Sequence, residues 1–137
     1  MKAFVDTSAW IALLVPSDKW HGDASSVFER ILQRNTLSVT SNYICDETIT
    51  WLRMRAGHGA AVEFRSIIDE AIAKRTLHLA WVNEKTDAHA WKLFTGHPGL
   101  KLSMTDCTSA VIAAELGAPI WSYDSDFAAL GCDVFTA

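Results

Sequence analysis

The stretch FVDTSAWIALL, residues 4–14, ends an apolar strand on an aspartate and then begins a helix. Residues 3–6, AFVD, predict a short buried strand, and the apolar residues of SAWIALLV recur at helical spacing until Pro16 stops the helix. The two hydroxyl residues of DTS can already cap this helix, so capping does not explain Asp6. The stretch alone predicts strand, turn and helix, and it leaves the purpose of the carboxylate open.

Predicted strands and helices alternate along the remaining chain. The expected helices cover residues 24–35, 43–56, 60–75, 86–94, 103–117 and the short stretch DFAAL at 126–130, and the expected strands cover residues 37–40, 76–82 and 119–122, with CDVF at 132–135 as a candidate edge strand. Such alternation favours parallel strands with helices on both faces of the sheet. We therefore expect an α/β fold with a central, mainly parallel twisted sheet of four to five strands.

Length and composition limit the range of functions. A chain of 137 residues, half of them hydrophobic, fits one domain, 1–137, with a single core. A net charge of −4 argues against binding nucleic acid through a general basic surface, so a polyanion would need local cations. Three widely spaced cysteines without a CxxC pair, no secretory signal and no apolar run near the ~18 residues of a membrane span predict a soluble cytoplasmic protein without a membrane partner.

Acidic residues follow two of the predicted strands. Asp6 ends the first strand, and Asp124 and Asp126 follow the strand in WSYDSDF. Asp106 lies in the first turn of the helix before that strand. Ligands of open parallel sheets bind beyond the carboxyl ends of the strands, where these residues are expected to meet. A purely structural role stays open for three of them, because Asp favours a first helical turn and Asp124 with Asp126 can cap DFAAL.

Glu47 is the fourth acidic candidate. On a helix over residues 43–56 it lies at the border of the apolar arc, between Trp51 and Met54, whereas Asp46 falls on the polar side. A solvated surface pair stays open for both carboxylates. Helical geometry favours Glu47 over Asp46 as the inward group.

Four carboxylates in one cleft would repel one another strongly without cations. All-oxygen ligation suits Mg²⁺ or Mn²⁺, with waters and substrate phosphates completing the shell. Two such ions about 4 Å apart can activate a water and stabilise the leaving oxygen in a displacement at phosphorus. If Asp6, Glu47, Asp106 and Asp124 converge, the sequence predicts metal-dependent phosphodiester hydrolysis.

At these residues the chain resembles PIN-domain ribonucleases, and in particular the VapC toxins of toxin–antitoxin pairs. The matching stretches occur in the family's order and span nearly the whole chain; they are FVDTSAWIALL, YICDETITWLR, LSMTDCTSAVIAAELG and IWSYDSDFAALG. The resemblance implies a PIN-like three-layer fold. It also implies endonucleolytic cleavage of RNA that depends on Mg²⁺ or Mn²⁺ as cofactor.

The resemblance assigns the catalytic and metal-binding residues. Three of them match the acidic positions of the family's motifs, and a fourth matches the last stretch; they are Asp6, Glu47, Asp106 and Asp124. Ser122 stands where the family usually has Thr, and it keeps the hydroxyl. Ser8, and with it Thr7, would bond to and orient the carboxylates, and Asp126 would be an accessory ligand or support one.

The resemblance also implies partners. These are a structured RNA such as tRNA or rRNA, a cognate antitoxin protein, and a second copy of the chain in a homodimer. Arg53 and Arg55 in WLRMR, with Lys101 ahead of the third acidic motif, are candidates for binding phosphate, and solvated surface charge is the simpler interpretation of all three.

The antitoxin is expected in a groove between the helices around residues 20–34 and 43–72. Four aromatic residues can line this groove or stack on bases, namely Trp10, Trp20, Trp51 and Phe64. Aromatic residues at helical spacing are most often part of the core, so this second interpretation stays open for each of them.

Two alternatives to a ribonuclease are a phosphoryl-transfer protein and a non-catalytic binding module. A response-regulator receiver would need an acidic pair after the first strand and a late lysine, and a haloacid-dehalogenase-like phosphatase would need DxD where this chain has DTS. A non-catalytic PIN-like module that binds RNA or protein would be favoured by a missing acidic position, and none is missing. The sequence therefore favours a metal-dependent ribonuclease.

Overall fold

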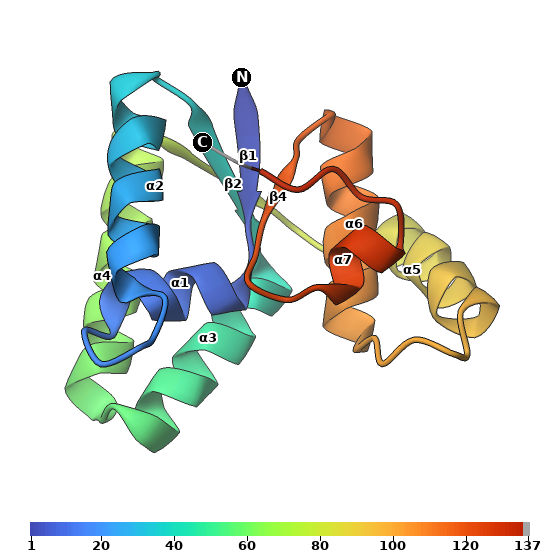
Figure 1. Cartoon of the computed structure of the whole chain (residues 1–137), viewed down its shortest axis with the longest axis horizontal. Helices are drawn as coiled ribbons and strands as arrows, with labels where there is room; N and C mark the ends of the chain where they lie inside the picture. Colours follow the sequence, from blue (N-terminus) through green and yellow to red (C-terminus); the bar gives the residue numbers. More distant parts are fainter. Residues whose placement is uncertain (136–137) are drawn as a thin grey trace.

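Parallel strands form the centre of the molecule in the order β3-β2-β1-β4, as the computed structural model shows (Figure 1). The structure describes residues 1–135, and within that range the sheet has four strands. They are β1 (Lys2–Val5), β2 (Leu37–Ser41), β3 (Leu77–Ala80) and β4 (Ile120–Trp121). All three neighbouring pairs are parallel, which confirms the expected α/β class and mainly parallel sheet.

The expected edge strand at 132–135 is reduced to a single bridge. Val134 pairs with Ile120 in parallel, and the Phe135 N–H donates to the Ile120 carbonyl over 2.8 Å. The neighbouring strand β4 has only two residues, so it offers too little backbone for a longer ladder.

Helices cover both faces of the sheet. Their bounds are α1 (Thr7–Leu14), α2 (His21–Gln33), α3 (Asn42–Arg55), α4 (His58–Ala73), α5 (Glu84–Gly96), α6 (Met104–Leu116) and α7 (Asp126–Ala129). In Figure 1, α2 and α4 lie on one side of the strands, and α5 and α6 lie on the other. This arrangement confirms the three-layer fold.

Helices α2, α4 and α5 each begin two or three residues earlier than the sequence predicts. Helix α5 starts at Glu84 because the Asn83 side chain accepts a hydrogen bond from the Thr86 N–H over 3.0 Å and caps the helix. Helix α2 starts at His21, within a polar stretch that has no apolar periodicity to reveal it. Helix α2 ends at Gln33, close to the expected end at residue 35, and Asn35 adopts a left-handed φ of 51° just beyond it.

The main core lies between the sheet and helices α1 to α4. Phe4, Val39 and Ile120 from three strands are fully buried. Trp10 and Phe64 pack edge to face with ring centroids 5.7 Å apart. No helix in residues 1–135 combines the length and the apolar character needed to span a bilayer.

Strand register fixes the place of the acidic residues. Val5 of β1 pairs with Trp121 of β4, so the next residues along the chain, Asp6 and Ser122, leave the same edge of the sheet together. Helix α1 starts directly after β1 and α3 directly after β2, so both begin at this carboxyl edge. The edge is therefore where side chains from distant parts of the sequence meet.

Candidate active site

Asp6 is the buried centre of the candidate site, with only 4% of its surface exposed. It occupies the N-cap of α1, yet its side chain makes no capping hydrogen bond. Instead, its Oδ2 accepts hydrogen bonds from the Ser8 hydroxyl over 2.9 Å and the Ser122 hydroxyl over 2.8 Å. The carboxylate is thus oriented by two side chains rather than used to start the helix.

Two serines form a bridge between α1 and the loop after β4. A hydroxyl has one proton, so when Ser8 and Ser122 both donate to Asp6, their own 3.1 Å contact adds no further donation. Each hydroxyl oxygen also accepts a backbone N–H, from Tyr123 for Ser8 (2.9 Å) and from Asp124 for Ser122 (3.0 Å). The loop that carries Asp124 is therefore tied directly to Asp6.

Thr7 does not play the part expected of its hydroxyl. The side chain is buried, and within residues 1–135 its Oγ1 has no hydrogen-bond partner. The hydrogen bond expected from the Thr7 hydroxyl to a carboxylate is therefore absent from the described residues, and Ser8 fills that role. A hydrogen bond from the Thr7 backbone still lowers the pKa of Asp6.

The environment of Asp6 disfavours its charged form. Burial raises the pKa of the carboxyl, and the hydrogen bonds from Ser122, Ser8 and the Thr7 backbone lower it in part. The negative charge of Glu47 raises the pKa further. A cation bound beside these carboxylates would offset their repulsion and favour the charged form of Asp6.

Asp106 has a structural and an electrostatic role at the start of α6. Its Oδ2 accepts the Ser103 N–H over 3.0 Å, and its own N–H donates to the Ser103 hydroxyl over 3.0 Å, which completes a capping box. Burial raises the pKa of Asp106, a hydrogen bond from Ser103 lowers it, and the charges of Asp6 and Asp124 raise it. The helix-start role left open by the sequence is present, and it leaves Oδ1 for another partner.

Asp124 likewise combines two roles. Its Oδ1 accepts the Asp126 N–H over 2.9 Å at the start of α7, while its charge acts on Asp106. Asp126 lies in the first turn of α7, and among residues 1–135 no recorded contact joins its carboxylate to Asp6 or Asp106. The structure thus brings Asp124 to the cluster and gives Asp126 no visible part in it.

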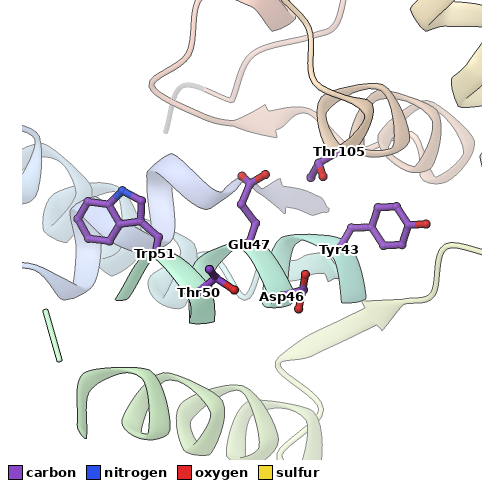
Figure 2. A pocket seen from close by; sticks show the side chains of 6 residues that line it. All are labelled: Tyr43, Asp46, Glu47, Thr50, Trp51 and Thr105. Carbon is purple, nitrogen blue, oxygen red and sulfur yellow. The ribbon is translucent and has the colours of Figure 1, made fainter. Parts of the chain in front are cut away.

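Glu47 reaches the cluster from α3 across an open cleft of about 540 Å³, which we call the acidic cleft. Its lining residues are Tyr43, Asp46, Glu47, Thr50, Trp51 and Thr105 (Figure 2). Glu47 extends from α3 towards α6, and its charge is the one that raises the pKa of Asp6. Asp46 also lines the cleft, and it is Glu47 whose charge raises the pKa of Asp6, in keeping with the preference for Glu47.

The three basic candidates are exposed. Arg55 holds its guanidinium 5.2 Å from the centre of the Trp51 ring, at one end of the acidic cleft. None of the three is a lining residue of the cleft, and Arg55 meets its wall through the contact with Trp51.

Two of the four aromatic candidates are core residues. Trp10 is 3% exposed and Phe64 is fully buried, so the suggestion that they stack on bases is wrong. Trp10 nevertheless lines the cavity between α2 and α4, in the region of the expected groove. Trp20 stacks on Tyr123 with centroids 5.1 Å apart, and the Tyr123 hydroxyl donates to Asp23 over 2.6 Å. Of the four aromatic candidates, Trp51 is the one that lines the acidic cleft.

Sequence reasoning missed the part played by Tyr123, whose backbone N–H anchors Ser8. No spacing rule could reveal it, because the contact joins residues 115 positions apart. It also missed Tyr43 and Thr105 on the walls of the cleft. Tyr43 could have been found from its distance of four residues to Glu47, which places both on one helical face.

The donors present fit a hard divalent cation. They are carboxylate and hydroxyl oxygens, and the acidic groups are close enough to raise one another's pKa. Within residues 1–135, no three His, Cys, Asp or Glu side chains stand close enough to form a ready-made metal site. Mg²⁺ commonly keeps several waters and takes only one or two carboxylates directly, so the donor set agrees with such an ion.

Comparison with known proteins places the fold. A family model for the PIN domain matches residues 3–131. The 23S rRNA-specific endonuclease VapC20 of Mycobacterium tuberculosis is 31% identical over 129 residues, which cover 93% of each chain. The crystal structure of that VapC20, a toxin that cleaves the sarcin-ricin loop, matches with a TM-score of 0.79 over 95% of both chains.

More distant structures share the architecture. VapBC2 from Rickettsia felis, solved with a DNA fragment from its promoter, is 13% identical and matches with a TM-score of 0.73 over 98% of both chains. VapBC-1 from nontypeable Haemophilus influenzae is 20% identical and matches with a TM-score of 0.67 over 98% of this chain and 97% of that one. At these identities the likeness concerns the fold alone.

Proposed function

The chain belongs to the PIN-domain family, in its VapC group, and on that premise we propose that it is an endoribonuclease that hydrolyses RNA phosphodiester bonds with Mg²⁺ or Mn²⁺. The observation that carries this proposal is the electrostatic linkage of four carboxylates at the carboxyl edge of the sheet. Glu47 acts on Asp6, and Asp6 and Asp124 both act on Asp106. Repulsion of this kind is relieved by a divalent cation, which can then bind a phosphate of the substrate.

The acidic residues and the serines have different roles in this proposal. Asp6 and Asp106 are the primary metal ligands, Glu47 places a metal ion or a water from the cleft side, and Asp124 completes the acidic set. Ser8 and Ser122 hold Asp6 in one orientation. When bound, Mg²⁺ or Mn²⁺ supplies the positive charge that activates a water and stabilises the reacting phosphate.

A structured RNA, such as rRNA or tRNA, is the proposed substrate. The 23S rRNA specificity of the relative VapC20 supports this class. The net charge of −4 disfavours binding of RNA phosphates over the protein surface as a whole. Metal ions at the site would supply the positive charge that attracts a phosphate there. Arg55 adds one further cation beside the cleft.

We further propose that the chain is the toxin of a toxin–antitoxin pair, silenced by a cognate antitoxin, and that it forms a homodimer. The relative VapC20 is a toxin, which supports the first part. A cavity of about 220 Å³ between α2 and α4 is lined in part by Phe28, Leu32 and Ile67, in the region expected for an antitoxin segment. Copurification of the chain with the product of the neighbouring reading frame tests this assignment.

Cleavage of purified rRNA and tRNA in the presence of Mg²⁺ or Mn²⁺ tests the enzymatic proposal. The wild-type chain should cut at discrete positions, and both Asp6→Asn and Asp106→Asn should lose at least 100-fold in rate. The matched control is Glu29→Gln, which removes an exposed carboxylate on α2. Equal cleavage by all four proteins would refute the site, and a non-catalytic binding module would then be the better description.

A further inference from the structure

Four side chains recur every four residues along α3, and we call them the α3 stripe. They are Tyr43, Glu47, Trp51 and Arg55. Residues separated by four positions lie on one face of a helix. The first three line the acidic cleft, and the guanidinium of Arg55 lies 5.2 Å from the centre of the Trp51 ring. A catalytic carboxylate is thus flanked by an aromatic ring on each side, with a cation at one end.

The rings of the stripe remain available to a ligand. Tyr43 is 36% exposed, and Trp51 is half-buried with part of its surface on the cleft wall. Figure 2 shows Tyr43 and Trp51 on either side of Glu47, with Thr105 facing them from α6. Of the four carboxylates, Glu47 lines the cleft, and Thr105 on the opposite wall immediately precedes Asp106 in the sequence.

We propose that Tyr43 and Trp51 are nucleobase-stacking subsites on the two sides of the scissile phosphate, and that Arg55 contacts a neighbouring phosphate. This inference rests on the proposed ribonuclease function and specifies the form of RNA that the site accepts. Aromatic side chains stack on any base, and this interaction needs no positive surface potential. Stacking therefore gives an acidic protein a way to hold RNA beside its carboxylates.

Helix geometry excludes a continuous base stack across the stripe. Eight residues of α-helix separate Tyr43 from Trp51, a rise of about 12 Å. Adjacent bases in one strand of a duplex lie only about 3.4 Å apart. Bases held by both rings must be splayed apart around Glu47, as in loops and bulges whose nucleotides are unstacked. The expected substrate is an unstacked segment within a structured RNA, and a duplex should be cut poorly.

Charge along the stripe sets the path of the RNA backbone. The RNA backbone is drawn towards the metal ions that Glu47 and the other carboxylates would hold, and towards Arg55 at the end of the stripe, because these are positive charges beside the cleft. The bases then face α3, where the rings are. This arrangement presents one phosphate to the carboxylates.

A double-mutant cycle between protein and RNA tests the inference. The probe is a synthetic hairpin that carries, in its loop, the cut mapped on rRNA or tRNA, together with versions that have an abasic nucleotide on either side of that cut. Trp51→Ala and Tyr43→Ala should each raise KM roughly 5- to 150-fold on the intact hairpin. Each abasic hairpin should raise the KM of the wild-type chain by a similar factor. It should not raise the KM of the matching Ala variant any further.

Conservative and remote variants separate stacking from folding. Trp51 also packs on the core, so Trp51→Phe and Tyr43→Phe, which keep a ring, should retain KM within about threefold. Trp91→Ala is the matched control, since it removes an aromatic ring that is 55% exposed on α5. Its KM should equal that of the wild-type chain, and thermal unfolding of every variant checks the fold.

The outcomes distinguish the two proposals. Two outcomes refute the stacking subsites and leave the ribonuclease standing, provided that the wild-type chain cuts RNA. In the first, the Ala variants keep the wild-type KM. In the second, the increase in KM caused by an Ala variant adds in full to the increase caused by the abasic hairpin. If the wild-type chain cuts no RNA with either metal ion, the ribonuclease fails, and the subsites fail with it. If the Ala variants cut normally but lose the antitoxin, the stripe is a protein-docking surface and the inference is overturned.

Discussion

The Ser122 hydroxyl donates a 2.8 Å hydrogen bond to Oδ2 of Asp6, although 116 positions separate the two residues in sequence. The pairing of β1 with β4 accounts for this contact, because Val5 lies beside Trp121 and each strand delivers its next residue to the same edge. The hydrogen bond is thus a direct product of the sheet topology. It joins the first acidic stretch of the chain to the last.

Replacing Ser122 should weaken catalysis without harming the fold. Ser122→Ala removes one of the two hydroxyl donors to Asp6 and the acceptor of the Asp124 N–H, so the rate of RNA cleavage should fall about 10- to 100-fold. Ser122→Thr keeps the hydroxyl and should stay within a few-fold of the wild-type rate. Ser66→Ala is the control, since that exposed hydroxyl donates only to a carbonyl of its own helix. A Ser122→Ala enzyme with full activity across a Mg²⁺ titration would contradict the role.

Neutralising Asp6 should stabilise the metal-free protein at neutral pH. The pKa of Asp6 is raised in the folded state, chiefly by burial. Its contribution to stability is therefore fully present below the ordinary carboxyl pKa of 3.8 and is lost as pH rises through the higher folded value. Asp6→Asn stays neutral at every pH. At pH 7 without metal its unfolding midpoint should exceed that of the wild-type chain by a few degrees, while RNA cleavage is lost.

The same pair of proteins supplies the checks. Below pH 4 the difference between the two midpoints should shrink, because the wild-type carboxyl is then protonated as well. Adding Mg²⁺ at pH 7 should raise the midpoint of the wild-type chain and leave Asp6→Asn unchanged. A midpoint for Asp6→Asn well below that of the wild-type chain at pH 7 would show that the charge itself stabilises the fold.

The two roles of Asp106 can be separated by choice of substitution. Asp106→Asn keeps an oxygen that can accept the Ser103 N–H, so the free energy of unfolding should change little while metal affinity and cleavage are lost. Asp106→Ala also removes this hydrogen bond and should cost about 1 kcal/mol in addition. Chemical denaturation and RNA cleavage on both variants test the separation. Equal destabilisation by Asn and Ala would show that the charge, rather than the hydrogen bond, supports the start of α6.

Local sequence patterns predicted the architecture well. Strands alternate with helices in FVDTSAWIALL and its successors, and periodicity located each element to within a few residues. The same patterns identified Asp6, Glu47, Asp106 and Asp124 as candidates, because a carboxylate at a strand end or on a helix border is visible without tertiary structure. The start of α5, which is fixed by the Asn83 cap, and the start of α2, which lies in a polar stretch, were misjudged.

Contacts between distant segments were beyond the reach of the sequence. The choice between Ser8 and Thr7 as the partner of Asp6 depends on how α1 turns against the loop after β4, and no local pattern encodes that rotation. The burial of Trp10 is equally a tertiary result, since its ring packs on Phe64 from α4. The helical spacing that placed Trp10 on the apolar face was correct, and it could not tell a core from a groove.

Glu47 and Asp46 offer a test with neighbouring carboxylates of equal charge. Both line the acidic cleft and both are exposed, so neither Glu47→Gln nor Asp46→Asn should shift the unfolding midpoint by more than about 1 °C. The charge of Glu47 raises the pKa of Asp6, so Glu47→Gln should weaken the apparent affinity for Mn²⁺ and cut the cleavage rate about 10- to 100-fold. Asp46→Asn should leave the apparent Mn²⁺ affinity and the cleavage rate within about threefold, because Asp46 is not one of the four carboxylates proposed to bind the metal. A Mn²⁺ titration of RNA cleavage with both variants decides between them, and equal losses would mean that the cleft binds the metal through its total charge rather than through Glu47.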